Sequence, residues 1–90
     1  MSYFENYLHY PLNWQTSAKV VRVSLSQQAN VRLLDEINYN NYKNGREYHF
    51  YGGLARLNPV EIPIPHPGIW HIVIDLGGGA GFLRASVEVF

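Results

Sequence analysis

The chain has 90 residues, which suits one domain with a modest core, and 47% of them are hydrophobic while 16% are charged. That balance is typical of a folded protein rather than a disordered one. Seven basic and seven acidic side chains cancel, which argues against nucleic acid or an anionic membrane as a partner, and the lack of cysteine excludes disulfides and thiolate metal sites.

The first two predicted strands come from alternation of apolar and polar residues. Aromatic residues and Leu8 mix with polar ones from Tyr3 to Tyr10, and we expect a short strand that ends at Pro11. Residues 18–26 (AKVVRVSLS) place three apolar side chains on one face and polar ones on the other, as a half-buried strand requires. The apolar three are Val21, Val23 and Leu25.

The next segment changes from strand to helix. After a turn at residues 27–29, NVRLLD alternates again, and the stretch DEINYNNYKNG follows. Asp35 suits a helix N-cap, Tyr39 and Tyr42 are three residues apart, and Asn44-Gly45 suits a left-handed helix end. We predict one or two helical turns. The alternative, in which Asn44-Gly45 is a type I′ hairpin turn between two strands, stays open.

The second half of the chain reads as further strands. REYHFYGG alternates until Gly52-Gly53 break the pattern, and LARLNPVEIPIP contains three prolines that confine it to a sheet edge. GIWHIVIDL is the most apolar run and is expected to be a central strand, while FLRASVEVF forms the last one. The predicted fold is all-β, a small antiparallel sandwich or partly open barrel with one short helical turn, in a single domain spanning residues 1–90.

The glycine run in VIDLGGGAG is similar to the phosphate-binding hairpin of actin-like and sugar-kinase-like ATPases. Those enzymes need two large lobes, which a chain of this length cannot supply. A Walker loop requires a following Lys-Ser or Lys-Thr and a helix, and neither follows these glycines. We therefore interpret the run as a hairpin, a tight connection or bulge that lets the last two strands reverse direction beside each other. Binding of a small anion by its bare backbone is the minor alternative.

Catalytic residues are not evident in the sequence. PHPGIWHIVID has a faint likeness to the second cupin motif, but the first motif with its paired His and Glu is missing. His71 and Asp75 lie about 13 Å apart on one extended strand, too far to share an ion. A small metal-dependent or hydrolytic enzyme working from His49, His66 or His71 remains the alternative function. No cofactor is expected.

Tyrosines offer a more suggestive feature. Tyrosine rings near Asn and Gly in loops suit the binding of a sugar, nucleobase or peptide. Trp70, between Ile69 and Ile72, is expected in the core, and Tyr48 joins the loop tyrosines. The predicted ligand-binding residues are Asn38, Tyr39, Tyr42, Tyr51, Gly78 and Gly79.

Several motifs in order resemble one uncharacterised bacterial family. QQANVRLLDEINYNNYKNG, YHFYGG and PVEIPIPHPGIWHIVIDLGGGAG together are similar to the family of domain of unknown function eighteen-eighty-three. The resemblance covers the chain from about Lys19 onward. It implies a small β-sandwich that occurs alone or beside TIR domains of defence or signalling proteins, and it brings no catalytic residues.

Taken together, these features predict a non-catalytic binding or interaction module. The partner is expected to be a small ligand, a protein or a second copy of the chain, since exposed edge strands favour assembly. The amino terminus lacks a signal-peptide pattern, and no window reaches the roughly 18 apolar residues of a membrane span, so we expect an unprocessed cytoplasmic protein.

Overall fold

The computed structural model describes residues 2–90 and confirms the predicted all-β fold. Antiparallel strands form open sheets that do not close into a barrel, and one helix interrupts them. The elements are β1 (Ser2–Phe4), β2 (Leu8–Gln15), β3 (Val20–Leu25), β4 (Ala29–Asp35), α1 (Glu36–Lys43), β5 (Tyr51–Ala55), β6 (Val60–Pro63), β7 (Gly68–Asp75), β8 (Gly81–Leu83) and β9 (Ala85–Val89).

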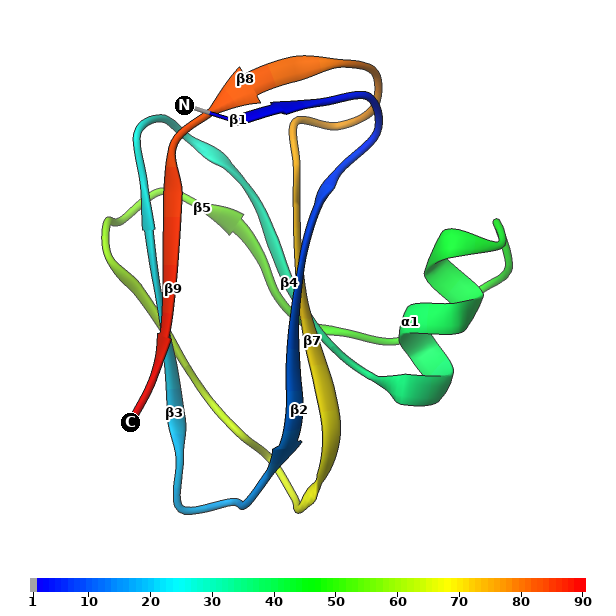
Figure 1. Cartoon of the computed structure of the whole chain (residues 1–90), viewed down its shortest axis with the longest axis vertical. Coiled ribbons are helices and arrows are strands. Elements are labelled where there is room, and N and C mark those ends of the chain that lie inside the picture. The colour runs from blue at the N-terminus through cyan, green and yellow to red at the C-terminus, as the bar shows by residue number, and fades with distance from the viewer. Residues whose placement is uncertain (1) are drawn as a thin grey trace.

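Two sheets face each other as a sandwich (Figure 1). One has the strand order β2-β7-β4-β5 and the other β6-β3-β9, while β1 and β8 pair at one end of the molecule. The central place of β7 confirms the prediction for GIWHIVIDL, and the edge place of β6 confirms the one for the proline-rich segment. Apolar composition placed β7 correctly, and proline content placed β6 correctly.

The main core lies between these two sheets and is built from their inward-facing residues. Val21 and Val23 on β3 are fully buried, and Trp70 on β7 is 1% exposed. Both observations confirm the sequence analysis. The indole N–H of Trp70 donates to the carbonyl of His66 at 3.0 Å, so the buried ring leaves no polar group unsatisfied.

Two predicted strand boundaries are wrong. Pro11 does not end its strand but lies within β2, which tolerates it because β2 is an edge strand and the register with β7 shifts between Pro11 and Asn13. Gly52 and Gly53 do not break a strand either. They lie inside β5 with positive φ, opposite Arg32 and Val31, whereas residues 46–50 are not a strand.

The interpretation of the glycine run as a hairpin between the last two strands is also wrong. Gly77, Gly78 and Gly79 do adopt positive φ in a turn after β7. The turn, however, leads to β8, which pairs with β1 and not with β7. After Arg84 the chain enters β9, which pairs with β3, so the last predicted strand is two strands in different sheets. The glycines thus carry the chain out of the larger sheet and into the short β1-β8 pair.

The predicted helix is confirmed, and the hairpin alternative is wrong. The carboxylate of Asp35 caps α1 by accepting the backbone N–H of Asn38 at 2.8 Å, and Gly45 follows the helix with φ 72°. The helix covers the outer face of the larger sheet, where Tyr39 packs in a second buried cluster on Leu34 and Val73. Within residues 2–90 no helix has the length and apolarity needed to span a bilayer.

Candidate functional site

The site lies on the outer face of the larger sheet, beside α1. Along β7, Trp70, Ile72 and Ile74 belong to the main core, so the alternate residues His71, Val73 and Asp75 point outward. Two of these are polar, and both are buried: His71 is 8% exposed and Asp75 is 5% exposed. Buried polar groups need partners, and each of the two residues organises its own cluster.

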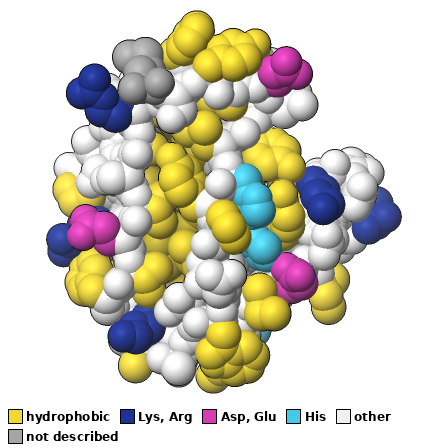
Figure 2. Space-filling model, in the orientation of Figure 1, with side chains coloured by type: hydrophobic (Ala, Val, Ile, Leu, Met, Phe, Trp, Pro, Cys, Tyr) yellow, Lys and Arg dark blue, Asp and Glu magenta, His cyan; other side chains and the backbone are white. Residues whose placement is uncertain are grey.

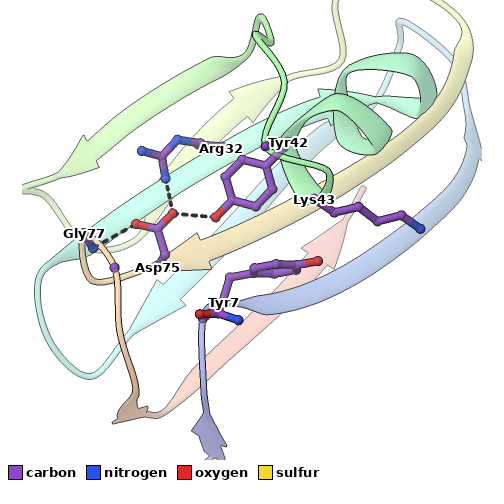
Figure 3. A pocket seen from close by; sticks show the side chains of 9 residues that line it. Tyr7, Arg32, Tyr42, Lys43, Asp75 and Gly77 are labelled. Atoms are coloured by element: carbon purple, nitrogen blue, oxygen red, sulfur yellow. Dashed lines mark hydrogen bonds and ion pairs between the residues drawn. The ribbon is translucent and has the colours of Figure 1, made fainter.

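Asp75 is the centre of the first cluster. Its Oδ1 accepts the side-chain amide of Asn30 and the backbone N–H of Gly77, both at 2.9 Å. Its Oδ2 accepts the hydroxyl of Tyr42 at 2.8 Å and forms a close ion pair with Arg32. We call these five residues the Asp75 cluster; it ties β4, β7, α1 and the glycine turn together (Figure 3).

These contacts set the ionisation of the cluster. Burial alone would raise the pKa of Asp75, but donors from Asn30, Gly77 and Tyr42 and the charge of Arg32 overcome that effect and hold the pKa below its ordinary value. Burial and the hydrogen bond to the carboxylate raise the pKa of the Tyr42 hydroxyl. At neutral pH, therefore, Asp75 is a carboxylate and Tyr42 is a neutral donor.

An open pocket of about 400 Å³ lies against this cluster. Figure 3 shows the carboxylate of Asp75 between Arg32, Tyr42 and Gly77, with Lys43 on the other side of the tyrosines. The rings of Tyr7 and Tyr42 meet edge to face, with centroids 5.1 Å apart. The residues that line the pocket are Asn6, Tyr7, Arg32, Tyr42, Lys43, Gly45, Asp75, Gly77 and Gly78.

His71 belongs to the second cluster, a chain of hydrogen bonds that we call the histidine chain. Nε2 of His71 contacts Glu36, and its Nδ1 lies 2.8 Å from Nε2 of His9. Nδ1 of His9 lies 3.2 Å from the hydroxyl of Tyr39, which lies 3.3 Å from the hydroxyl of Tyr7. Figure 2 shows histidine side chains at the surface between β2 and α1.

The direction of every bond in the histidine chain follows from the carboxylate at its end. Glu36 only accepts, so His71 carries its proton on Nε2 and accepts on Nδ1 from Nε2–H of His9. Nδ1 of His9 then accepts from Tyr39. With both imidazoles neutral, all of their nitrogens are satisfied within the protein. Neither ring has a nitrogen left to act on a substrate.

The hydroxyl of Tyr39 is held within the histidine chain by hydrogen bonds. Burial comes first among the causes that raise its pKa to about 12, followed by the hydrogen bond with Tyr7 and the negative charge of Glu36. Its ring lies nearly parallel to those of His9 and His71, with centroids 4.2 and 4.4 Å away. Tyr39 therefore packs between helix and sheet as a neutral phenol.

We expect the stability of the fold to decrease on mild acidification through His9. Burial comes first among the causes that lower the pKa of His9 below its ordinary 6.5, followed by the electrostatic effects of His71 and Lys43. The unfolded chain therefore binds this proton first, so the contribution of neutral His9 is complete above pH 6.5 and is lost as the pH falls towards the folded-state pKa.

Urea unfolding at pH 7.5 and pH 5.5 measures this effect. His9→Gln should lose less stability over that interval than the wild type, whereas His49→Gln, at an exposed position, should keep the wild-type dependence. Equal pH dependence in His9→Gln and wild type would show that His9 does not carry the effect.

Two of the predicted ligand-binding residues line the pocket, and four do not. Tyr42 and Gly78 line it, and Gly79 is the next residue of the same turn. Tyr39 is buried in the histidine chain. The remaining two serve the fold in other ways.

Asn38 and Tyr51 make structural contacts away from the pocket lining. The Asn38 backbone is held by the cap residue Asp35, and its side-chain oxygen accepts the backbone N–H of His49 at 2.8 Å. Tyr51 begins β5, and its ring lies edge to face with Trp70 at 6.1 Å. The tyrosines of the predicted loop cluster thus divide between different parts of the molecule.

The three histidines of the alternative enzyme hypothesis lie in different surroundings. His49 is exposed after α1, His66 packs on Trp70 with ring centroids 4.9 Å apart, and His71 is buried in the histidine chain. In the part of the chain that the structure describes, no group of three or more His, Asp and Glu side chains could hold a metal ion.

Sequence reasoning missed Arg32, Lys43 and Tyr7 in the pocket. In the sequence Arg32 is only a polar residue within the alternating stretch NVRLLD. Lys43 and Tyr7 come from a helix end and from the segment before β2, which only the tertiary fold brings to the same place. One signal was available: Asp75 ends the most apolar strand, where an isolated carboxylate needs a cationic partner.

The chain was compared with known proteins. One family, described as Domain of unknown function (DUF1883), matches residues 5–90. No match is found among curated proteins or among solved structures. The family match agrees with the resemblance carried by the sequence motifs.

Proposed function

Because this chain belongs to the family described as Domain of unknown function (DUF1883), which names no activity, we propose a function from the geometry of the pocket. We propose a non-catalytic binding module that holds a small anionic molecule beside the Asp75 cluster. The observation that carries the proposal is that Lys43, which forms no ion pair within residues 2–90, lines one open pocket together with Arg32.

The electrostatics of the pocket favour an anion. Asp75 accepts four donors and neutralises Arg32, so its carboxylate has little capacity left for a ligand. Lys43 forms no ion pair in the described part of the chain and leaves the pocket with an unbalanced positive charge.

The rest of the lining suits the remainder of such a molecule. Gly78 is exposed, and a Cβ built on it would have nothing within 4 Å, so its backbone is accessible from the pocket. The edge-to-face rings of Tyr7 and Tyr42 offer an apolar wall to a planar group. A ligand with one phosphate or carboxylate group on a flat ring combines both features.

Phenyl phosphate and phenol form a matched pair of probes that separates the contribution of the charge to binding from that of the ring. We expect phenyl phosphate to shift the backbone amide signals of Gly45, Gly77 and Gly78 in a nuclear magnetic resonance titration, and phenol to shift them much less. Inorganic phosphate, without the ring, should bind more weakly than phenyl phosphate. Equal binding of phenol and phenyl phosphate, or shifts confined to other residues, would contradict the proposal.

Lys43→Gln tests the contribution of the unpaired cation. Because Lys43 is exposed, we expect its loss to weaken phenyl phosphate binding only about two- to fivefold. Lys19→Gln, an equally exposed charge outside the pocket lining, is the matched control and should keep the wild-type affinity. If Lys43→Gln binds phenyl phosphate as tightly as Lys19→Gln does, Lys43 is not part of the site.

A further inference from the structure

One edge strand of the sandwich lacks proline, glycine with positive φ and register shifts, which interrupt pairing between molecules. β2 carries Pro11 and the register shift before Asn13, β5 carries Gly52 and Gly53 with positive φ, and the short β6 ends at Pro63. β9 has none of these features, since its sequence ASVEV contains no proline or glycine and its register with β3 is continuous. It is therefore the edge most ready to accept another strand.

The free backbone groups of β9 can be assigned from its pairing with β3. Phe90 and Val20 exchange two backbone hydrogen bonds, at 2.8 and 3.0 Å, and the N–H of Ser26 donates to the carbonyl of Arg84. Every second residue between these points therefore also faces β3. The residues left with N–H and C=O directed at the open edge are Ala85, Val87 and Val89.

The inner side chains of β9 also lie at an opening in the molecule. Hydrophobic side chains are visible along the gap between β9 and β2 (Figure 2). On both edge strands most of the residues that pack against the core are only partly buried, unlike their counterparts on the central strands; Leu12 of β2 is the buried exception. The partly buried residues are Leu8 and Tyr10 on β2 and Ala85, Val87 and Val89 on β9.

We propose that β9 pairs antiparallel with β9 of a second copy of this chain, with Val87 opposite Val87 of that copy. Each outward N–H and C=O of the strand then gains a partner, and the two three-stranded sheets become one continuous sheet. The apolar inner side chains of the second strand extend the cover over the opening. This interface is separate from the anion pocket, which lies on the other sheet.

The charge of Glu88 and the length of β9 favour this register over the registers centred on Glu88 or Ser86. With Val87 at the two-fold axis, Glu88 faces Ser86 of the second copy, and no like charges meet. A shift that centres the pair on Glu88 would place two carboxylates directly opposite each other. A shift that centres it on Ser86 would leave Val89 beyond the end of the paired strand and forfeit its hydrogen bonds. Only pairing at Val87 uses the whole of β9.

Cysteine cross-linking tests both the partner and the register, because the natural chain contains no cysteine. Ser86 and Glu88 are exposed on the outer face, and the proposed register brings each within disulfide distance of the other in the second copy. Under mild oxidation a mixture of Ser86→Cys and Glu88→Cys should form a disulfide dimer. Neither variant alone should do so; a dimer from either one alone would overturn the register.

Light scattering of the unmodified chain tests the assembly itself. We expect a dimer that dissociates on dilution, and a monomer at all concentrations would overturn the proposal. Val87→Pro removes an N–H that faces the open edge and not β3, so it should weaken the dimer at least about tenfold while retaining the β-sheet circular dichroism spectrum. Ser86→Lys, which faces Glu88 of the second copy, is the control and should dimerise as well as the wild type or better.

Discussion

Asp75→Asn is expected to lower the free energy of unfolding by about 3 kcal/mol or more, because removing one partner of a buried ion pair leaves the other charge uncompensated. The side chains of Asp75 and Arg32 are 7% and 17% exposed, so water replaces little of the lost interaction. The new amide would also point its own N–H group at the donors that now converge on Oδ1 or Oδ2. A domain of this size has roughly 5–13 kcal/mol in total, so the loss is a large share of it.

Urea denaturation at pH 7 measures this effect, and the chain offers a matched control. Arg22 and Glu61 form an exposed ion pair at 2.8 Å with 40% and 48% exposed side chains, so Glu61→Gln should cost less than about 1 kcal/mol. Adding Arg32→Met to Asp75→Asn should recover part of the stability by removing the orphaned charge. If Asp75→Asn and Glu61→Gln cost the same, the Asp75 cluster does not stabilise the fold as described.

The second large effect is expected at Gly52, where alanine should cost more than about 3 kcal/mol. A Cβ at this position would overlap the backbone carbonyl oxygen of Val31 and lie 3.2 Å from Cδ1 of Ile62. The residue also has φ 110°, a conformation that L side chains rarely adopt. The carbonyl is part of the β4 ladder and cannot move aside without breaking sheet hydrogen bonds.

Substitution of the neighbouring Gly53 separates the steric overlap with Val31 from the strain of a positive φ. Gly53 has φ 138°, but a Cβ there would have nothing within 4 Å, so Gly53→Ala carries only the backbone strain of about 1–3 kcal/mol. Thermal unfolding should therefore show a clearly larger drop in Tm for Gly52→Ala than for Gly53→Ala, since each kcal/mol corresponds to roughly 4–8 °C in a domain of this length. Equal drops would mean that the close approach to Val31 is unimportant.

The regular strands and the helix could be predicted because their signals are local. Alternation located β3, a continuous apolar run located β7, and Asp35 followed by a polar, aromatic stretch located α1. Pro11 and Gly52 misled the prediction because their usual effect depends on which neighbour a strand has. Pro11 lies on an edge, and the positive φ of Gly52 is accommodated inside a paired strand.

The candidate site was harder to predict because it depends on register between distant segments. His9 lies opposite Val73, and Arg32 lies opposite Val73 on the other side of β7. Neither pairing can be deduced from the alternation of apolar and polar residues in a single strand. The apolar sequence around Asp75 indicates that its carboxylate needs a cationic partner. It does not indicate which of the basic residues is that partner.

The order of strand pairing has a consequence for how this protein is made. β1 pairs with β8, β2 pairs with β7, and β3 lies between β6 and β9. A chain emerging from the ribosome therefore presents its first three strands with no partner until β6 and the strands after it have been synthesised. We expect folding to begin only after the second half of the domain has been synthesised and to be slow for the size of the domain, with apolar strands that need shielding in the interval.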